Sequence, residues 1–315
     1  MPSSAFQLLF FVATCVMKSR SLMSSSSRGN VLVASNGISP LIFWQNINYP
    51  PASLAKCPST RVNFVYVPTA SMYIDPDSPS ERSIGQRRQR QRANMKKKLA
   101  RIVNQLEMNR EYSREPSLSN GAINAKFLDL ADPKTTSTDA CEAICHWADC
   151  VYLEGGNTFY LAWHMRRLGL DLAIKKMISS ETDGVRRETE NDRDRHLGPS
   201  LIVGISAGAI VLGKSLATAL WKGWDKPIPE IDVDDLTSPM MAGLDLCGDT
   251  SFFPHYEKDK WEVFVQDRAG DLGHRCTVLN EQKTNENGIY DQGTHHYYAC
   301  VSMTCNEDGK IPGLR

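Results

Sequence analysis

Short, nearly continuous apolar runs recur along the chain, and stretches with helical periodicity lie between them. The runs are rich in β-branched and aromatic residues, which predicts strands at 31–36, 62–67, 126–130, 150–153 and 201–205. Helices are predicted at 139–148, at 158–168 and within 81–114. Strands that are apolar throughout are typical of a sheet covered on both faces. The alternation therefore predicts an α/β fold with a doubly wound, mostly parallel sheet.

The segment from residue 81 to residue 114 is strongly basic at first and then amphipathic. One helical stripe, at i, i+3, i+4 and i+7, is formed by Leu99, Ile102, Val103 and Leu106. It follows a cluster of cations: Arg87, Arg88, Arg90, Arg92, Lys96, Lys97 and Lys98. The cluster fits a nuclear-localisation or nucleic-acid patch, or the solvated start of a helix or loop. The second interpretation is favoured because no aromatic residues or known binding motif accompany the cations, so no nucleic-acid partner is expected.

The composition fits a folded protein without a charge bias. The chain has 315 residues, 41% of them hydrophobic, and a formal net charge of zero. Such a chain can fill a core, and it has no general attraction to nucleic acid or membrane. The nine cysteines are scattered and lack a CxxC pair, which favours reduced core thiols over a disulfide framework or a zinc site. We expect no metal and no cofactor.

The first 28 residues differ from the rest. An apolar run from Ala5 to Met17 is followed by Lys18, Arg20 and a Ser-rich stretch. The run is too short to span a bilayer, and its cations follow it, which fits an organellar transit peptide better than a secretory signal. A disordered leader is the alternative, so a cytoplasmic and an organellar location both stay open.

We expect residues 29–315 to form a single α/β domain. A basic insertion is expected near 81–115, and a charged insertion near 184–199. Both a monomer and a homodimer are compatible with this sequence.

The sharpest motif is Gly204-Ile205-Ser206-Ala207-Gly208, a GxSxG pentapeptide between a predicted strand and a helix. In this setting a serine sits on a tight turn with its hydroxyl exposed, and small neighbours prevent clashes. The amide that follows it lies near a helix N-terminus and can stabilise an oxyanion. A structural turn is the alternative, but the strand–turn–helix context favours a nucleophile at Ser206.

A nucleophilic serine needs a base, and His255 is the best candidate because it lies at a predicted strand end in an apolar setting. The pair His295 and His296 is a weaker alternative. A third group should orient the imidazole. The residues themselves barely separate the candidates for this acid, which are Asp225, Asp245 and Asp249.

A second glycine turn joins the strand at 150–153 to the helix at 158–168. It contains Gly155, Gly156 and Asn157. Glycine amides at a helix N-terminus can approach a bound oxygen closely. A plain strand–helix connection is the alternative, and a nearby nucleophile makes the binding role the better hypothesis.

Four segments carry a family resemblance: Leu153–Phe159 (LEGGNTF), Gly204–Ala209 (GISAGA), Gly243–Leu246 (GLDL) and Phe253–Tyr256 (FPHY). In this order and spacing they resemble the S51 serine peptidases, the group of peptidase E (aspartyl dipeptidase) and cyanophycinase. The GGNT turn and the G-x-SAGA elbow are specific as a pair, and the resemblance covers residues 31–280. It implies a flavodoxin-like or class I glutamine-amidotransferase-like sheet, with serine replacing the amidotransferase cysteine.

The resemblance also implies roles for single residues and a small, aspartyl-type peptide as substrate. Ser206 matches the nucleophile and His255 the base. Trp224-Asp225-Lys226-Pro227 is similar to the segment that carries the family's acid, which favours Asp225 over Asp249. The Gly156 and Ala207 amides match the oxyanion hole, with Gly155 and Asn157 beside it. Relatives often place arginines after the histidine, and Arg268 is the nearest substitute here.

Two other functions compete with a peptidase. An α/β-hydrolase esterase shares GxSxG and the order Ser, Asp, His. Only 49 residues separate Ser206 from His255, which leaves little room for the strands that such an enzyme places before its histidine. A catalytically inert binding protein on the same fold is the second rival. The serine, the histidine and both glycine turns argue against it.

Overall fold

The computed structural model describes residues 30–38, 41, 62–78, 82–112, 123–179, 201–280 and 298–300. The predicted leader at 1–28, the charged insertion near 184–199 and the pair His295 and His296 lie outside the described residues.

The main sheet has six strands in the order β3-β2-β4-β5-β1-β8. Their bounds are Ile123–Phe127 for β3, Val62–Val67 for β2, Cys150–Leu153 for β4, Leu201–Ile205 for β5, Asn30–Ala34 for β1 and Tyr298–Cys300 for β8. Every neighbouring pair from β3 to β1 is parallel, and β8 adds antiparallel to β1. The predicted fold class, an α/β fold with a mostly parallel sheet, is confirmed.

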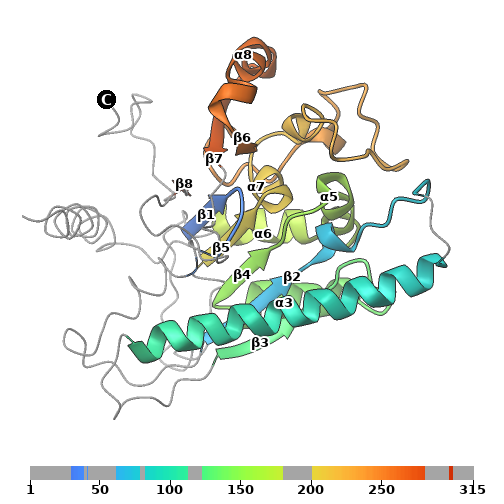
Figure 1. Ribbon diagram of the computed structural model, residues 1–315, viewed down its shortest axis with the longest axis vertical. Helices are drawn as coiled ribbons and strands as arrows, with labels where there is room; N and C mark the ends of the chain where they lie inside the picture. Colours follow the sequence, from blue (N-terminus) through green and yellow to red (C-terminus); the bar gives the residue numbers. More distant parts are fainter. Residues whose placement is uncertain are drawn as a thin grey trace, which may run out of the picture.

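Helices cover both faces of this sheet (Figure 1). The long helix α3 (Ile84–Tyr112) runs across one face, while α5 (Thr158–Arg167), α6 (Leu170–Ser179) and α7 (Ala207–Leu212) cover the other. Strands β1, β2, β4 and β5 contribute side chains to the cores on both faces, because successive side chains of a strand point to opposite faces. The doubly covered sheet explains why its central strands are apolar throughout.

Strand β2 shows this alternation clearly. Val65 and Val67 belong to the core on the α5–α7 side, whereas Phe64 and Tyr66 belong to the core under α3. All four side chains are buried. A one-residue shift of β2 would exchange small valines for large rings in both cores, so the packing of side chains of different size opposes such a shift.

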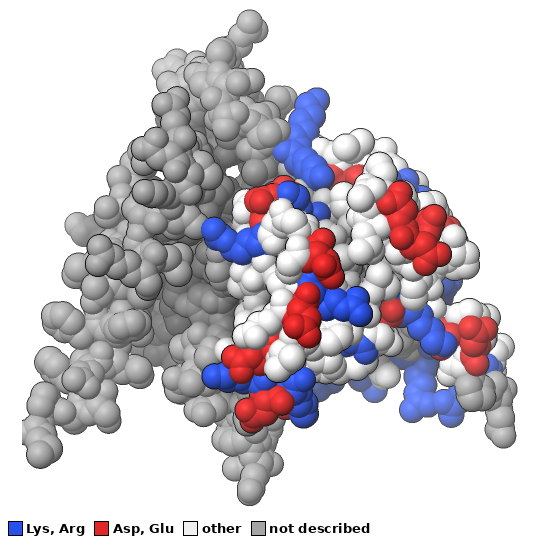
Figure 2. All heavy atoms as spheres, turned by 90° about the horizontal axis from the view of Figure 1, so that it is seen from above, with Lys and Arg blue, Asp and Glu red and all other residues white. Residues whose placement is uncertain are grey.

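The basic segment forms the helix that covers one face of the sheet. Leu99, Ile102 and Leu106 of α3 are buried against the sheet, as the predicted stripe requires. Cations in the first half of the helix contact the protein itself, for example Arg92 with Asp132 at 2.5 Å. On the described surface seen in Figure 2, basic and acidic side chains are interspersed. That face shows no broad patch of one sign.

The first strand, expected at 31–36, is β1 (Asn30–Ala34), and two further predicted elements differ more from the observed ones. The third strand was expected at 126–130, but β3 ends at Phe127. Leu130 is buried for another reason: it lies in a loop, and its N–H donates to Thr69 Oγ1 at 2.8 Å. The helix expected at 139–148 begins earlier, as α4 (Ser137–Cys141), and continues as a π-helix (Glu142–Trp147). A capping box between Thr136 and Asp139 sets its start.

A second, two-stranded sheet brings His255 to the main sheet. Strand β6 (Thr250–Tyr256) pairs in parallel with β7 (Arg275–Asn280), and α8 (Lys258–Ala269) connects the two. Backbone and side-chain bonds tie β6 to the segment after α7; one is the bond from Thr218 Oγ1 to the Phe252 carbonyl, at 2.7 Å. The second sheet is therefore fixed beside the helix that follows the serine.

Within the described part of the chain, no helix is both long and apolar enough to cross a membrane. In those same ranges, no three His, Cys, Asp or Glu side chains are grouped to share a metal ion. The free thiols described are those of Cys141, Cys145, Cys150, Cys247 and Cys276. Burial raises the pKa of Cys145 and of Cys276 to about 11, so these thiols stay protonated at neutral pH.

Candidate active site

Ser206 sits on a strained turn between strand β5 and helix α7. Its backbone has φ 50° and ψ −108°, an uncommon conformation for a residue with a side chain. The turn is tightly packed: a Cβ on Gly204 would lie 2.7 Å from Leu212 Cδ1, and one on Gly208 would lie 2.8 Å from Leu153 Cβ. The Ser206 N–H donates to the Ala34 carbonyl at 2.9 Å. The GxSxG glycines thus allow the turn that presents the serine.

The structure places the predicted nucleophile and the predicted base in contact. Ser206 Oγ lies 2.8 Å from His255 Nε2, within hydrogen-bonding distance. His255 also has positive φ, 54°, near the end of β6. Its backbone N–H donates to Ser35 Oγ at 2.9 Å, and Ser35 Oγ donates to the Leu279 carbonyl at 2.5 Å. The histidine is therefore fixed by the residue after β1 and, through it, by β7.

Lys222 also bonds to the backbone of this histidine. Its Nζ donates to the Pro254 carbonyl at 2.8 Å and to the His255 carbonyl at 2.5 Å. Sequence analysis missed both Lys222 and Ser35. Ser35 could have been suspected, because it follows a parallel strand at the carboxyl edge of the sheet, where sites gather.

The glycine turn after β4 lies directly against Ser206. A Cβ built on Gly155 would be 3.1 Å from Ser206 Cβ and 3.6 Å from its Oγ. The Gly155 carbonyl accepts a bond from Ser71 Oγ at 2.5 Å. In a trans peptide the carbonyl and the next N–H point in opposite directions. The Gly156 N–H is therefore aimed away from Ser71.

Gly156 is packed against a neighbouring turn, where a side chain would overlap with backbone atoms. Its φ is +136°, a region that favours glycine, and a Cβ there would lie 2.5 Å from Ser71 N and still closer to the Ala70 carbonyl. Within the described residues, neither the Gly156 N–H nor the Ala207 N–H donates to a protein acceptor. Within the described residues, these two turns next to Ser206 thus each carry a backbone N–H without a protein acceptor.

A buried carboxylate supports this turn from behind. Glu154 Oε1 accepts the Gly155 N–H at 3.0 Å, and Oε2 accepts the Tyr66 hydroxyl at 2.6 Å. Lys98 of α3 forms an ion pair with the same carboxylate at 2.9 Å. Burial, and then the Glu154 charge, raise the pKa of Tyr66 well above its ordinary value. Sequence analysis missed this network, since a lysine in a basic run gave no sign of an inward partner.

Asp225 and Asn157 both lie at the N-terminus of α5. Asn157 Oδ1 caps the helix by accepting the Tyr160 N–H at 2.8 Å, and its Nδ2 donates to the Lys226 carbonyl at 2.7 Å. Asp225 Oδ2 accepts the Thr158 N–H at 3.1 Å. Burial raises the pKa of Asp225 above its ordinary value. The role of Asp225 as orienting acid stays a prediction.

The other candidates, Asp245, Asp249 and Arg268, have contacts with residues outside the Ser206–His255 pair. Asp245 Oδ1 accepts the Asp249 N–H at 2.9 Å. Asp249 pairs with Lys214 at an exposed turn, and that contact lowers the pKa of Asp249. The guanidinium of Arg268 lies on exposed α8, 5.5 Å from the ring centroid of Phe264 on the same helix. A substrate-binding role for Arg268 stays a prediction.

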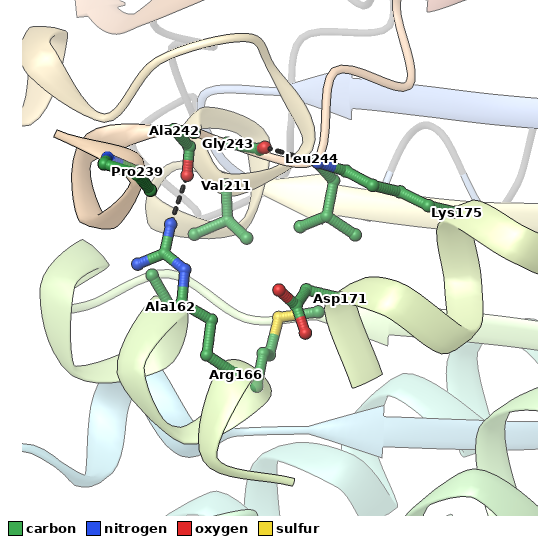
Figure 3. A pocket seen from close by; sticks show the side chains of 10 residues that line it. Ala162, Arg166, Asp171, Lys175, Val211, Pro239, Ala242, Gly243 and Leu244 are labelled. Atoms are coloured by element: carbon green, nitrogen blue, oxygen red, sulfur yellow. Dashed lines mark hydrogen bonds between the residues drawn. The ribbon is translucent and has the colours of Figure 1, made fainter. Parts of the chain in front are cut away.

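A small cavity of about 60 Å³ lies away from Ser206 and His255, between α5, α6 and the loop at 239–244 (Figure 3). Arg166 donates to the Met240 and Ala242 carbonyls, and Lys175 donates to the Gly243 carbonyl at 3.3 Å. The cations lining the cavity thus hold a loop in place, and the cavity contains no residue of the Ser206 site.

No model of a known protein family matches the sequence, and a search of curated proteins finds no relative. Matching solved structures include a protein from Listeria monocytogenes EGD-e provisionally named peptidase E, at 15% sequence identity and a TM-score of 0.40, which covers 86% of this chain and 98% of that one. Another is a peptidase from an acI-B1 Actinobacterium, at 15% identity and a TM-score of 0.41, with 81% of each chain covered. Matches at this identity and TM-score assign no activity to the chain.

Proposed function

We propose that this protein is a serine-type hydrolase that cleaves peptides, with Ser206 as nucleophile and His255 as base. The observation that carries the proposal is the 2.8 Å contact between Ser206 Oγ and His255 Nε2. Positive φ at both residues adds support. Strain of this kind costs about 1–3 kcal/mol per residue and clusters at functional sites.

The proposed reaction uses the Ser206–His255 contact together with the two backbone N–H groups. His255 Nε2 takes the hydroxyl proton while Ser206 Oγ attacks the substrate carbonyl. The Gly156 and Ala207 N–H groups donate to the oxyanion that forms. The imidazolium then gives its proton to the leaving nitrogen, the C–N bond breaks, and an acyl-serine remains. A water molecule, deprotonated by His255, releases the acid product and restores the hydroxyl.

For the substrate we infer small, aspartyl-type peptides, as for S51 peptidases. Support comes from the sequence: the GGNT turn, the G-x-SAGA elbow and the segment around His255 stand in the order of that family. We assign the orienting acid to Asp225 on the same basis. Its neighbour Trp224 has its ring centroid 5.7 Å from that of His255, which keeps this segment beside the imidazole.

The two rivals leave observations unexplained. An esterase of the α/β-hydrolase kind does not account for the GGNT turn, with Gly155 packed against Ser206. An inert binding protein does not need positive φ at a serine, nor a histidine nitrogen beside its hydroxyl.

Activity screening of the full-length chain tests the proposal. Dipeptides with N-terminal aspartate and short esters are offered to the wild type, to Ser206→Ala and to Ser83→Ala, which changes an exposed serine at the start of α3. We expect turnover of dipeptides by the wild type and Ser83→Ala, and none by Ser206→Ala. Turnover of esters alone would favour the esterase, and turnover that survives in Ser206→Ala would remove Ser206 from the mechanism.

A further inference from the structure

Aromatic side chains gather beside the imidazole of His255. The ring centroid of Trp224 lies 5.7 Å from that of His255 and 6.4 Å from that of Trp261 on α8. The ring centroid of Trp261 lies 5.9 Å from that of Phe253. Trp224 is 62% exposed, which is unusual for the largest apolar side chain. An aromatic surface therefore faces solvent next to the proposed base.

Lys222 holds these rings in place. Its Nζ lies 4.5 Å from the ring centroid of Trp224, 4.4 Å from that of Phe253 and 4.7 Å from that of Trp261. The same ammonium is anchored by the carbonyls of Pro254 and His255. Cation–π attraction and hydrogen bonds thus fix the rings relative to the imidazole. A surface fixed before binding loses little conformational freedom when it takes up a ligand.

The position of the rings indicates which part of a substrate would reach them. A Cβ built on Gly155 would lie 3.1 Å from Ser206 Cβ. The glycine turn, which carries the proposed oxyanion donor Gly156, therefore lies directly beside the serine. The leaving nitrogen must come to His255 Nε2 to receive its proton. A residue attached to that nitrogen therefore passes the imidazole, and the ring centroid of Trp224 lies 5.7 Å from that of His255.

We propose that Trp224 forms the subsite for the leaving residue and that this subsite takes an aromatic side chain. The inference rests on the proposed function, because it uses the Ser206–His255 direction to orient the substrate. An indole offers a large, rigid apolar face to a second ring. The gain from such a pair corresponds to about a 3- to 10-fold preference for an aromatic over a glycine leaving residue.

Protection of Ser206 from a fluorophosphonate probe measures this preference without a known substrate. Phenylalaninamide and glycinamide imitate the two leaving residues, and each is titrated against the labelling rate of the full-length protein. The variants are Trp224→Ala, Trp224→Gln and Trp224→Phe. Leu172→Ala is the matched control, since it truncates another exposed apolar side chain, on α6.

We expect phenylalaninamide to protect the wild type at about 3- to 10-fold lower concentration than glycinamide. The advantage should vanish in Trp224→Ala and Trp224→Gln and persist in Trp224→Phe and Leu172→Ala. The subsite would be overturned if the two amines protect the wild type equally, or if phenylalaninamide keeps its advantage in Trp224→Ala and Trp224→Gln. In either case, labelling of Ser206 would still support the proposed function. If Ser206 is labelled neither in the wild type nor in any of the variants, both the subsite and the proposed function are overturned.

Discussion

Replacing Gly156 by alanine adds a single methyl group to the glycine turn after β4, which carries a proposed oxyanion donor. The added Cβ would lie 2.5 Å from Ser71 N and closer still to the Ala70 carbonyl, where real Cβ atoms are not found. The backbone there also has φ +136°, which strains any residue with a side chain. The turn must move to accept the methyl group, and the Gly156 N–H moves with it.

The loss of stability in Gly156→Ala can be worked out from the backbone strain and the overlap of the added Cβ. The unfavourable φ costs about 1–3 kcal/mol, and the overlap with packed backbone costs about 1–3 kcal/mol more. The free energy of unfolding should therefore fall by about 2–6 kcal/mol. Loss of one donor from a known oxyanion hole lowers kcat by about 10²–10³-fold, and we expect a loss of this size from the proposed donor at Gly156.

Gly169→Ala is the matched control. Gly169 has φ +69°, but a Cβ there meets nothing within 4 Å. It should lose only about 1–2 kcal/mol from its backbone conformation, with no effect on activity. Denaturant unfolding and the rate of fluorophosphonate labelling are measured for both variants. Equal losses of stability, or full labelling of Gly156→Ala, would refute the description of this turn.

Three further predictions concern single side chains. Ser71→Ala frees the Gly155 carbonyl, so labelling should slow about 5- to 50-fold while the free energy of unfolding falls by only about 1 kcal/mol; unchanged labelling would show that Ser71 does not aim the Gly156 amide. Asp225→Asn keeps an acceptor for the Thr158 N–H and removes a carboxylate whose pKa burial has raised, so the Tm at neutral pH should hold or rise. If Asp225 orients His255, labelling by the same variant falls about 10²–10⁴-fold; intact labelling would remove it from the triad. Burial, and then nearby arginines, lower the pKa of His164 to about 4. As the pH falls, His164 is therefore protonated at a lower pH in the folded state than in the unfolded state. The free energy of unfolding should therefore drop, by about 1–2 kcal/mol after solvent screening, as pH falls from about 6.5 to 4. His164→Gln should lose this contribution, whereas the exposed control His146→Gln should keep it.

Much of the fold could be predicted because its determinants are local. Strands at 62–67, 150–153 and 201–205 were found to the residue, since each is a short apolar run covered on both faces. The third strand was misplaced because Leu128 and Leu130 are apolar for a different reason. They fill a buried loop, and a run of alternating apolar residues does not separate a loop from a strand.

In the candidate site, too, features set by local sequence could be predicted and contacts between distant residues could not. Ser206 and the glycine turns were recognisable, because strand–turn–helix geometry restricts residue types over a few positions. The supporting contacts were not, since they join residues that are ordinary in sequence and distant along the chain. Glu154 pairs with Lys98 of α3, and Ser71 bonds the Gly155 carbonyl 84 positions away. Only the folded chain brings these partners together.

The most direct test of the account is the labelling of Ser206 by a fluorophosphonate, mapped by mass spectrometry and followed with pH. We predict adduct formation at Ser206 and none in Ser206→Ala. The rate should fall toward acidic pH, where a protonated imidazole can no longer accept the hydroxyl proton, and His255→Ala should abolish both labelling and its pH dependence. Absence of an adduct on folded wild-type protein, or equal labelling of His255→Ala, would contradict the claim that these two residues form a nucleophile and its base.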